Sequence, residues 1–319
     1  MPANTRDIQR RIKSVNNTKK ITRAMEMVAA SKMKRAINMV LQTRPYANLS
    51  WNTVLNLSQV NGSNDHPLLE QRDKYKRVLL ILISSNRGLC GGYNVQVHSK
   101  AVSSIKKHEN GDKITDVITM GKKGAELMRR DGYNIIADFE KPDLATGVHE
   151  VQALAKMIID NFLAGDNDKV MVAYTDFISS VNQVPRVKQL LPIQLDSEDK
   201  YLGIVGSDDK VGTTKDFIKE KEEKYLKKGE FKYEYVFEPS VKEVLNEILP
   251  RLIEVQLYQA LLESNASEHS ARMVGMRNAT DAAGDMIDEL TLYYNKARQA
   301  SVTNEIAEIS AGAQAMSNK

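Results

Sequence analysis

Few residues in this chain of 319 amino acids could carry out chemistry, and their spacing does not support a catalytic site. The single cysteine, Cys90, has no nearby histidine to activate it as a nucleophile, and no Gly-x-Ser-x-Gly motif occurs. The histidines also lack metal-ligand spacing. They are His66, His98, His108, His149 and His269. The sequence therefore predicts a protein that is not an enzyme and has no bound metal or cofactor.

A glycine-rich turn, NRGLCGGYN at residues 86–94, is the best candidate for a phosphate site. It follows a buried-strand sequence and precedes a helical one, an arrangement that can hold a phosphate at a helix N-terminus. Its glycines fit neither GxGxxG nor GxxxxGK[ST], and the segment MGKKG at residues 120–124 fails both patterns as well. We therefore interpret the turn as structural.

The middle of the chain alternates between strand-like and helix-like segments. Such an order is typical of a mainly parallel sheet with helices on its faces, so we expect a central Rossmann-like α/β domain at residues 75–195. The expected strands are 77–84, 116–120, 133–136 and 170–177, with a proline-containing edge strand at 183–194. The expected helices are 95–108, a short one after Gly121, and 148–163.

Both ends of the chain have the apolar spacing of three and four residues that is typical of long amphipathic helices. We expect an antiparallel coiled coil between residues 1–58 and 239–319, because a central domain joins them. Pro45 predicts a kink or stop near Thr43. Small residues lie on the expected seams and would allow close packing; they are Ala29, Ala36, Ala266, Ser270, Ala283 and Ala297.

Composition and charge limit the possible classes further. One cysteine excludes an intramolecular disulfide, and the longest apolar run, residues 78–83, is too short to cross a bilayer. Residues 1–44 carry eleven basic side chains and two acidic ones. This basic arm has two interpretations, contact with nucleic acid or an anionic membrane, and contact with acidic protein loops. The helical pattern continues past Met33 without a cleavage-like break, which favours a mature N-terminus over a transit peptide.

Three sequence segments together resemble one known family. RIKSVNNTKKITRAMEMVAASKMKRA at residues 11–36, SSNRGLCGGYN at 84–94 and the segment from SEHSARMVGMRNATDAAG to EIAEISAGA at 267–313 closely resemble the gamma subunit of the F-type ATP synthase. The start MPANTRDIQRRI, without a presequence, looks bacterial. The resemblance implies a non-catalytic central-stalk rotor subunit of the proton-translocating ATP synthase. It would couple rotation of the membrane ring to conformational change in the catalytic beta subunits during ATP synthesis or hydrolysis.

The same resemblance implies partners and a location. The partners would be the alpha and beta subunits of the catalytic hexamer, the epsilon subunit and the membrane rotor ring, and not nucleic acid. The chain would lie at the cytoplasmic face of the bacterial cell membrane, as a peripheral protein held only through the complex. The alternative, a basic coiled-coil nucleic-acid-binding protein, is disfavoured because no aromatic residues alternate with the basic ones.

The resemblance also implies contact residues. Contact with a beta subunit would involve Met25, Lys19, Lys20, Arg23, Lys32, Arg35, Arg298, Gln299 and Thr303. The tip turning in an apolar sleeve would include Ile306, Ile309 and Ala313. Contact with the membrane ring or epsilon would involve Tyr235, Phe237 and Glu238. Residues 196–230 are longer than this region of the family and hold 18 charges in 35 positions, so we expect a surface insert with a short helix at 214–227.

Overall fold

The computed structural model describes residues 5–58, 66–70, 76–108, 114–193, 238 and 240–317. The chain forms two compact units. One unit comprises residues 29–272 and contains a sheet with its covering helices. The other comprises residues 1–28 and 273–319, whose described residues form the outer parts of the two terminal helices.

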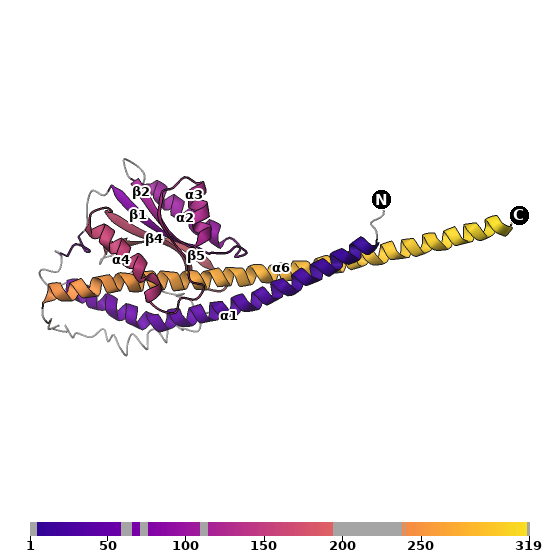
Figure 1. The fold of residues 1–319 in the computed structure, drawn as a ribbon. Helices are drawn as coiled ribbons and strands as arrows, with labels where there is room; N and C mark the ends of the chain where they lie inside the picture. Colours follow the sequence, from indigo (N-terminus) through magenta and orange to yellow (C-terminus); the bar gives the residue numbers. More distant parts are fainter. Residues whose placement is uncertain are drawn as a thin grey trace. The chain divides into compact units, whose positions relative to one another are not determined.

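The sheet of the larger unit has five strands in the order β3-β2-β1-β4-β5 (Figure 1). β1 (Arg77–Ile83), β2 (Ile114–Met120), β3 (Ile135–Phe139) and β4 (Lys169–Phe177) are parallel to one another. β5 (Gln183–Leu191) pairs antiparallel with β4 at the edge. An edge strand tolerates Pro185, which has no N–H to donate. The expected mainly parallel α/β domain is confirmed.

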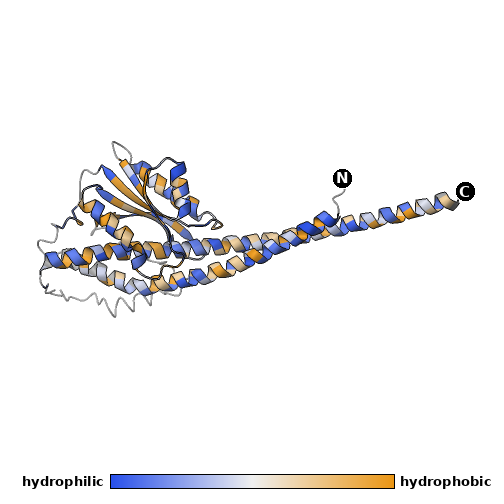
Figure 2. Ribbon diagram, in the orientation of Figure 1, coloured by the Kyte–Doolittle hydropathy of each residue, from blue (hydrophilic) through white to orange (hydrophobic). Residues whose placement is uncertain are grey.

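The central strand β1 is buried on both faces, as its continuous apolar sequence predicts. Leu80 and Leu82 belong to a core shared with Val97 and Ile105 of α2 (Tyr93–His108). α3 (Lys122–Arg130) contributes Met128 to the same core. The intervening β1 residues point to the opposite face. The apolar strands are orange in Figure 2.

The opposite face of the sheet is covered by α4 and by part of the C-terminal helix. Leu79, Ile81 and Ile83 of β1 belong to a core with residues such as Ile158 of α4 (His149–Leu163). The C-terminal helix α6 (Val241–Ser317) adds a run of buried apolar side chains to it. They include Leu245, Leu249, Leu252, Leu257, Leu261 and Leu262.

In the smaller unit the two terminal helices pack against each other in antiparallel directions. Thr22 of α1 (Thr5–Ser58) lies with its hydroxyl oxygen 2.7 Å from that of Thr280 of α6. Glu26 lies four residues after Thr22 in α1, and Arg277 lies three residues before Thr280 in α6. The Glu26 carboxylate accepts a hydrogen bond of 2.9 Å from Arg277. The positions change in opposite directions, which confirms the antiparallel pairing.

The stop that Pro45 predicts does not occur, because α1 continues to Ser58. Proline removes one helical hydrogen bond, and tertiary packing can outweigh that loss. Val40 and Val54, on either side of the proline, are fully buried in the core. Similarly, α6 continues through Pro250, with buried Leu249 beside it.

Candidate functional site

The end of α6 extends beyond the part that α1 can cover. The antiparallel register, continued from the Thr22–Thr280 pair to the first helical residue Thr5, places Thr5 opposite residues near Arg298. From Arg298 to the end of the helix, every described side chain is exposed. Within the described part of this unit, the last turns of α6 therefore have no partner helix.

An apolar stripe runs along this free helix end. Val302, Ile306, Ile309 and Met316 are exposed to 49%, 60%, 72% and 83%, and Ala313 lies at the intervening step. The spacing of four, three, four and three residues places them on one face of the helix. A continuous exposed apolar face indicates a binding surface for another protein. Ile306, Ile309 and Ala313, the residues expected at the tip, all belong to this stripe.

The polar residues expected to contact a beta subunit are also exposed on this stretch. They are Arg298, Gln299 and Thr303. The Thr303 hydroxyl donates to the carbonyl oxygen of Gln299 at 2.9 Å, a bond within the helix itself. The three side chains are therefore open to an external partner.

The basic residues expected on α1 separate into two groups. Lys20 and Arg23, like Arg35 in the larger unit, are exposed. Lys19 is half-buried, and its side chain packs over Gly284 of α6. A Cβ added to this glycine would lie 3.0 Å from the Lys19 Nζ.

Two further contact candidates on α1 are partly covered. Lys32 donates at 2.8 Å to the Asp143 carboxylate of the same chain, and this hydrogen bond lowers the pKa of Asp143. Met25 is half-buried beside Glu26, which Arg277 holds in the helix pair. Lys19 and Lys32 thus have contacts inside the chain, whereas the exposed side chains of Lys20, Arg23 and Arg35 are accessible to a partner protein.

Of the residues expected at the membrane ring or epsilon, Glu238 is exposed. Tyr235, Phe237 and residues 196–230, with the helix expected at 214–227, lie outside the described residues. Among the described residues, no helix has both the length and the apolar character needed to cross a membrane. In the same part of the chain, no group of three or more histidine, cysteine or acidic side chains is placed to hold a metal ion.

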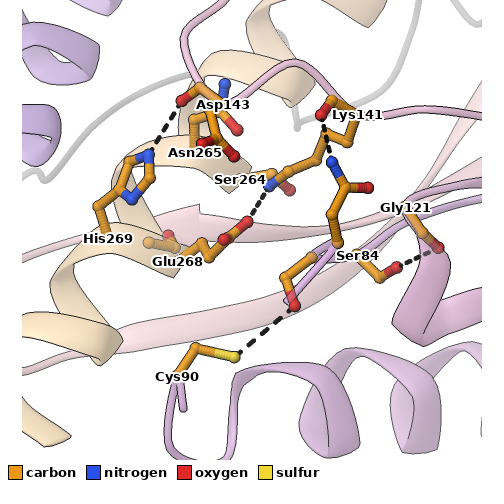
Figure 3. Close-up of polar contacts among 12 residues, drawn as sticks. Ser84, Cys90, Gly121, Lys141, Asp143, Ser264, Asn265, Glu268 and His269 are labelled. Carbon is orange, nitrogen blue, oxygen red and sulfur yellow. Dashed lines mark hydrogen bonds and ion pairs between the residues drawn. The ribbon is translucent and has the colours of Figure 1, made fainter. Parts of the chain in front are cut away.

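The structure also reveals a buried charged cluster that the sequence did not predict (Figure 3). Glu268 of α6 pairs with Lys141, which follows β3, and both side chains are almost completely buried. Arg272, one helical turn further, forms an ion pair with the same carboxylate at 2.8 Å. The Lys141 ammonium also lies 5.7 Å from the centre of the Tyr93 ring.

The charges in this cluster stabilise one another. Burial alone would raise the pKa of Glu268, but Lys141 and Arg272 outweigh burial and hold it below its usual value. Burial alone would lower the pKa of Lys141, and the Glu268 carboxylate reverses this and raises it. The pair is therefore ionised although it is removed from water.

His269 joins this cluster to the segment after β3. Its Nε2 lies 3.0 Å from the Asp143 carbonyl oxygen, to which it donates, and its Nδ1 lies 3.4 Å from Arg272 Nη1. A neutral ring satisfies both contacts, since Nδ1 must accept from the guanidinium. Burial lowers the pKa of His269, which favours that neutral form.

The glycine-rich turn lies against the same part of α6. Arg272 donates to the carbonyl oxygens of Arg87 and Gly88 at 3.3 and 3.4 Å. Gly91 has a φ of +56°, and a Cβ there would lie 4.0 Å from the Ala271 carbonyl oxygen. Positive φ favours glycine. These contacts agree with the structural interpretation of the turn.

Comparison with known proteins identifies the family. A family model described as ATP synthase matches residues 4–316. A protein of Chloroflexus aurantiacus named ATP synthase gamma chain is 40% identical over 320 residues, covering both chains completely. The ATP synthase gamma chain of Legionella pneumophila strain Corby is 36% identical over 98% of this chain and all of that protein. That of Coxiella burnetii strain RSA 493 is 38% identical over 98% of each.

Solved structures have the same fold at lower sequence identity. A chain of the Euglena gracilis mitochondrial ATP synthase (OSCP/F1/c-ring) aligns over 98% of this chain and 94% of that chain, with a TM-score of 0.61 and 18% identity. A chain from the central stalk and c-ring of the Tetrahymena thermophila mitochondrial ATP synthase aligns over 81% and 99%, with a TM-score of 0.55 and 23% identity. The chain belongs to the ATP synthase family that the matching model describes, and its curated relatives are gamma chains.

Proposed function

We propose that this chain is the central-stalk rotor subunit of an F-type ATP synthase. It is a non-catalytic subunit of the complex and couples rotation of the membrane ring to conformational change in the catalytic beta subunits. Membership of the gamma-chain family supports this role. The structural observation that carries the proposal is the free end of α6, which exposes a regular apolar stripe and has no partner helix among the described residues.

The proposed surroundings of the stalk are the alpha and beta subunits of the catalytic hexamer. The apolar stripe, with Ile306, Ile309 and Ala313, would turn inside an apolar sleeve, where buried apolar area stabilises the contact without fixing one orientation. Exposed polar and basic side chains would meet acidic loops of beta. They are Lys20, Arg23, Arg35, Arg298, Gln299 and Thr303, with Met25 beside them.

The proposed foot of the stalk lies near the start of α6. Tyr235, Phe237 and Glu238 would contact the membrane ring and the epsilon subunit, and Glu238 is exposed as such a contact requires. The chain would then be peripheral, held at the cytoplasmic face of a bacterial membrane by the complex.

The proposed mechanism depends on differential contact. An asymmetric stalk meets three chemically identical beta subunits with three different surfaces. Each surface can favour one conformation, and a ligand or partner shifts an equilibrium only by its differential affinity for the two states. Rotation changes which surface each beta subunit meets, so the nucleotide affinities change in turn.

The test is to express the chain with alpha, beta and the remaining subunits of a bacterial relative. The isolated chain should release no phosphate from ATP, whereas the complex should hydrolyse ATP and acidify inverted membrane vesicles. Turnover by the isolated chain, or coupled complexes that form without it, would refute the proposal.

A pair of variants tests the stripe. Ile306→Asp with Ile309→Asp should weaken retention of the chain in the complex, because two side chains lose apolar burial. Glu308→Gln, on an exposed position between them, is the control and should assemble normally. Equal retention of both variants would show that the stripe is not a binding surface.

A further inference from the structure

The part of α6 that faces the α/β domain carries an unusual number of buried polar side chains. Between residues 263 and 270, seven of them are exposed to 3% or less. They are Glu263, Ser264, Asn265, Ser267, Glu268, His269 and Ser270. Burying polar groups costs free energy unless they are hydrogen-bonded, and apolar residues would fill the same space without that cost. This polar run therefore calls for an explanation beyond packing.

The polar run bonds to separate segments of the α/β domain. Ser267 donates to the Thr175 carbonyl oxygen at 3.1 Å, at the end of β4. Ser270 donates to the Ser180 carbonyl oxygen at 2.7 Å, in the connection to β5.

Other bonds from the same run reach the segment after β3, and Arg272, two residues beyond the run, reaches the glycine-rich turn. Asn265 donates to the Pro142 carbonyl oxygen at 3.2 Å, beside the His269 bond to Asp143. Arg272 holds the turn at Arg87 and Gly88. Most acceptors are backbone carbonyl oxygens, which are fixed by the fold and do not move with a side-chain rotamer.

Such contacts define one rotational position of the domain about the helix. Rotation by one residue turns an α-helix by about 100° and displaces it by about 1.5 Å. Hydrogen bonds weaken steeply with such misalignment, whereas apolar contact is non-directional and can be re-formed at a neighbouring position. The ion pair of Lys141 with Glu268 depends most strongly on this rotational position, since a displaced partner would leave a buried charge unpaired.

We infer that the Lys141–Glu268–Arg272 cluster and the adjacent polar run form a torque-bearing joint that prevents the α/β domain from turning about α6. The inference rests on the proposed rotor function, in which force from the membrane ring reaches the α/β domain and must pass into α6. Lys141 and Glu268 act as positioning residues and take no part in nucleotide chemistry. The joint keeps rotation of the domain and rotation of the helix equal under load.

The experiment uses the complete complex in inverted membrane vesicles. Lys141→Met combined with Glu268→Gln removes both charges of the buried pair and replaces them with neutral side chains of similar size. Without an opposing gradient, ATP hydrolysis should stay within about twofold of the wild type, because replacing a buried ion pair together often preserves stability. Under load, the joint should slip, and the steady-state proton gradient per assembled complex should fall at least about twofold.

Two further variants make the outcome decisive. Ser267→Ala with Ser270→Ala removes two directional hydrogen bonds without changing charge, and should lower the proton gradient by a smaller factor. If the charge variant does not assemble, this serine variant alone tests the joint. Leu262→Ala, buried in the same helix segment, is the control. It should reduce the yield of complex and leave the gradient per complex unchanged.

The results separate the two proposals. Assembled joint variants that build a wild-type gradient would overturn the joint, and so would a Leu262→Ala complex with the same loss of gradient. If the wild-type chain itself supports no gradient in an assembled complex, the proposed rotor function fails instead.

Discussion

Replacing Glu268 by glutamine should destabilise the larger unit more than replacing Lys141 by methionine. Glu268 holds two cations, Lys141 and Arg272, so its loss leaves like charges in a buried site. Removing one partner of a buried ion pair costs about 3–5 kcal/mol. Lys141→Met removes one charged hydrogen bond, about 1.5–3 kcal/mol, because Glu268 keeps Arg272 at 2.8 Å.

Hydrogen exchange of the β1 amides in the isolated full-length chain can measure both costs, since a fully buried central strand exchanges only when the unit opens. The double variant should cost less than the sum of the single variants, because it leaves one cation, Arg272, without a carboxylate, whereas Glu268→Gln alone leaves two. His149→Gln, at an exposed position, is the control. Equal costs for the two single variants would refute the reasoning, because they would mean that Arg272 does not share the Glu268 charge.

Three further predictions concern stability and assembly. Gly284→Ala should stabilise the helix pair by about 0.5–1 kcal/mol, measured by exchange of α6 amides, since the new methyl meets only the flexible end of Lys19; a loss of stability would show that the helices pack more tightly there. Unfolding free energy should fall as pH decreases below about 6.5, because the folded pKa of His269 is lowered and the unfolded chain binds the extra proton. Urea titrations should show His269→Gln removing up to about 1.4 kcal/mol per pH unit of that slope, and an unchanged slope would contradict the assignment. Deleting residues 196–230 and joining the ends with a short Gly/Ser linker should preserve assembly with alpha and beta, measured by copurification, because surface insertions change loop-closure entropy only weakly; a chain that no longer assembles would show that the segment is structural.

The elements with strong periodicity could be predicted from the sequence. The continuous apolar run of β1 predicts a buried strand, and the repeated three- and four-residue spacing of α1 and α6 predicts long helices. Pro185 indicated that β5 is an edge strand. Of the kink or stop predicted near Thr43, the stop was wrong, because local propensity contains no information about the core contacts of Val40 and Val54.

The buried charged cluster could not be predicted for a related reason. Lys141 and Glu268 are 127 positions apart, and charged residues in an amphipathic pattern normally indicate the solvent face. α6 is covered on several sides at this level, so its polar residues are buried as well. The free end of α6, in contrast, could be interpreted from its sequence, because its apolar positions and its exposed polar ones alternate without ambiguity.

The antiparallel pair has a consequence for synthesis of the chain. Thr22 is made first, and its contact Thr280 follows 258 residues later. At a translation rate of about 5–20 residues per second, this part of α1 waits about 13–50 s for its partner. During that time an apolar seam would be open to aggregation and to chaperones. Lys19, Thr22 and Glu26, which face α6 in the finished pair, make the waiting seam polar at these three positions, so it is less prone to aggregation than a wholly apolar seam would be.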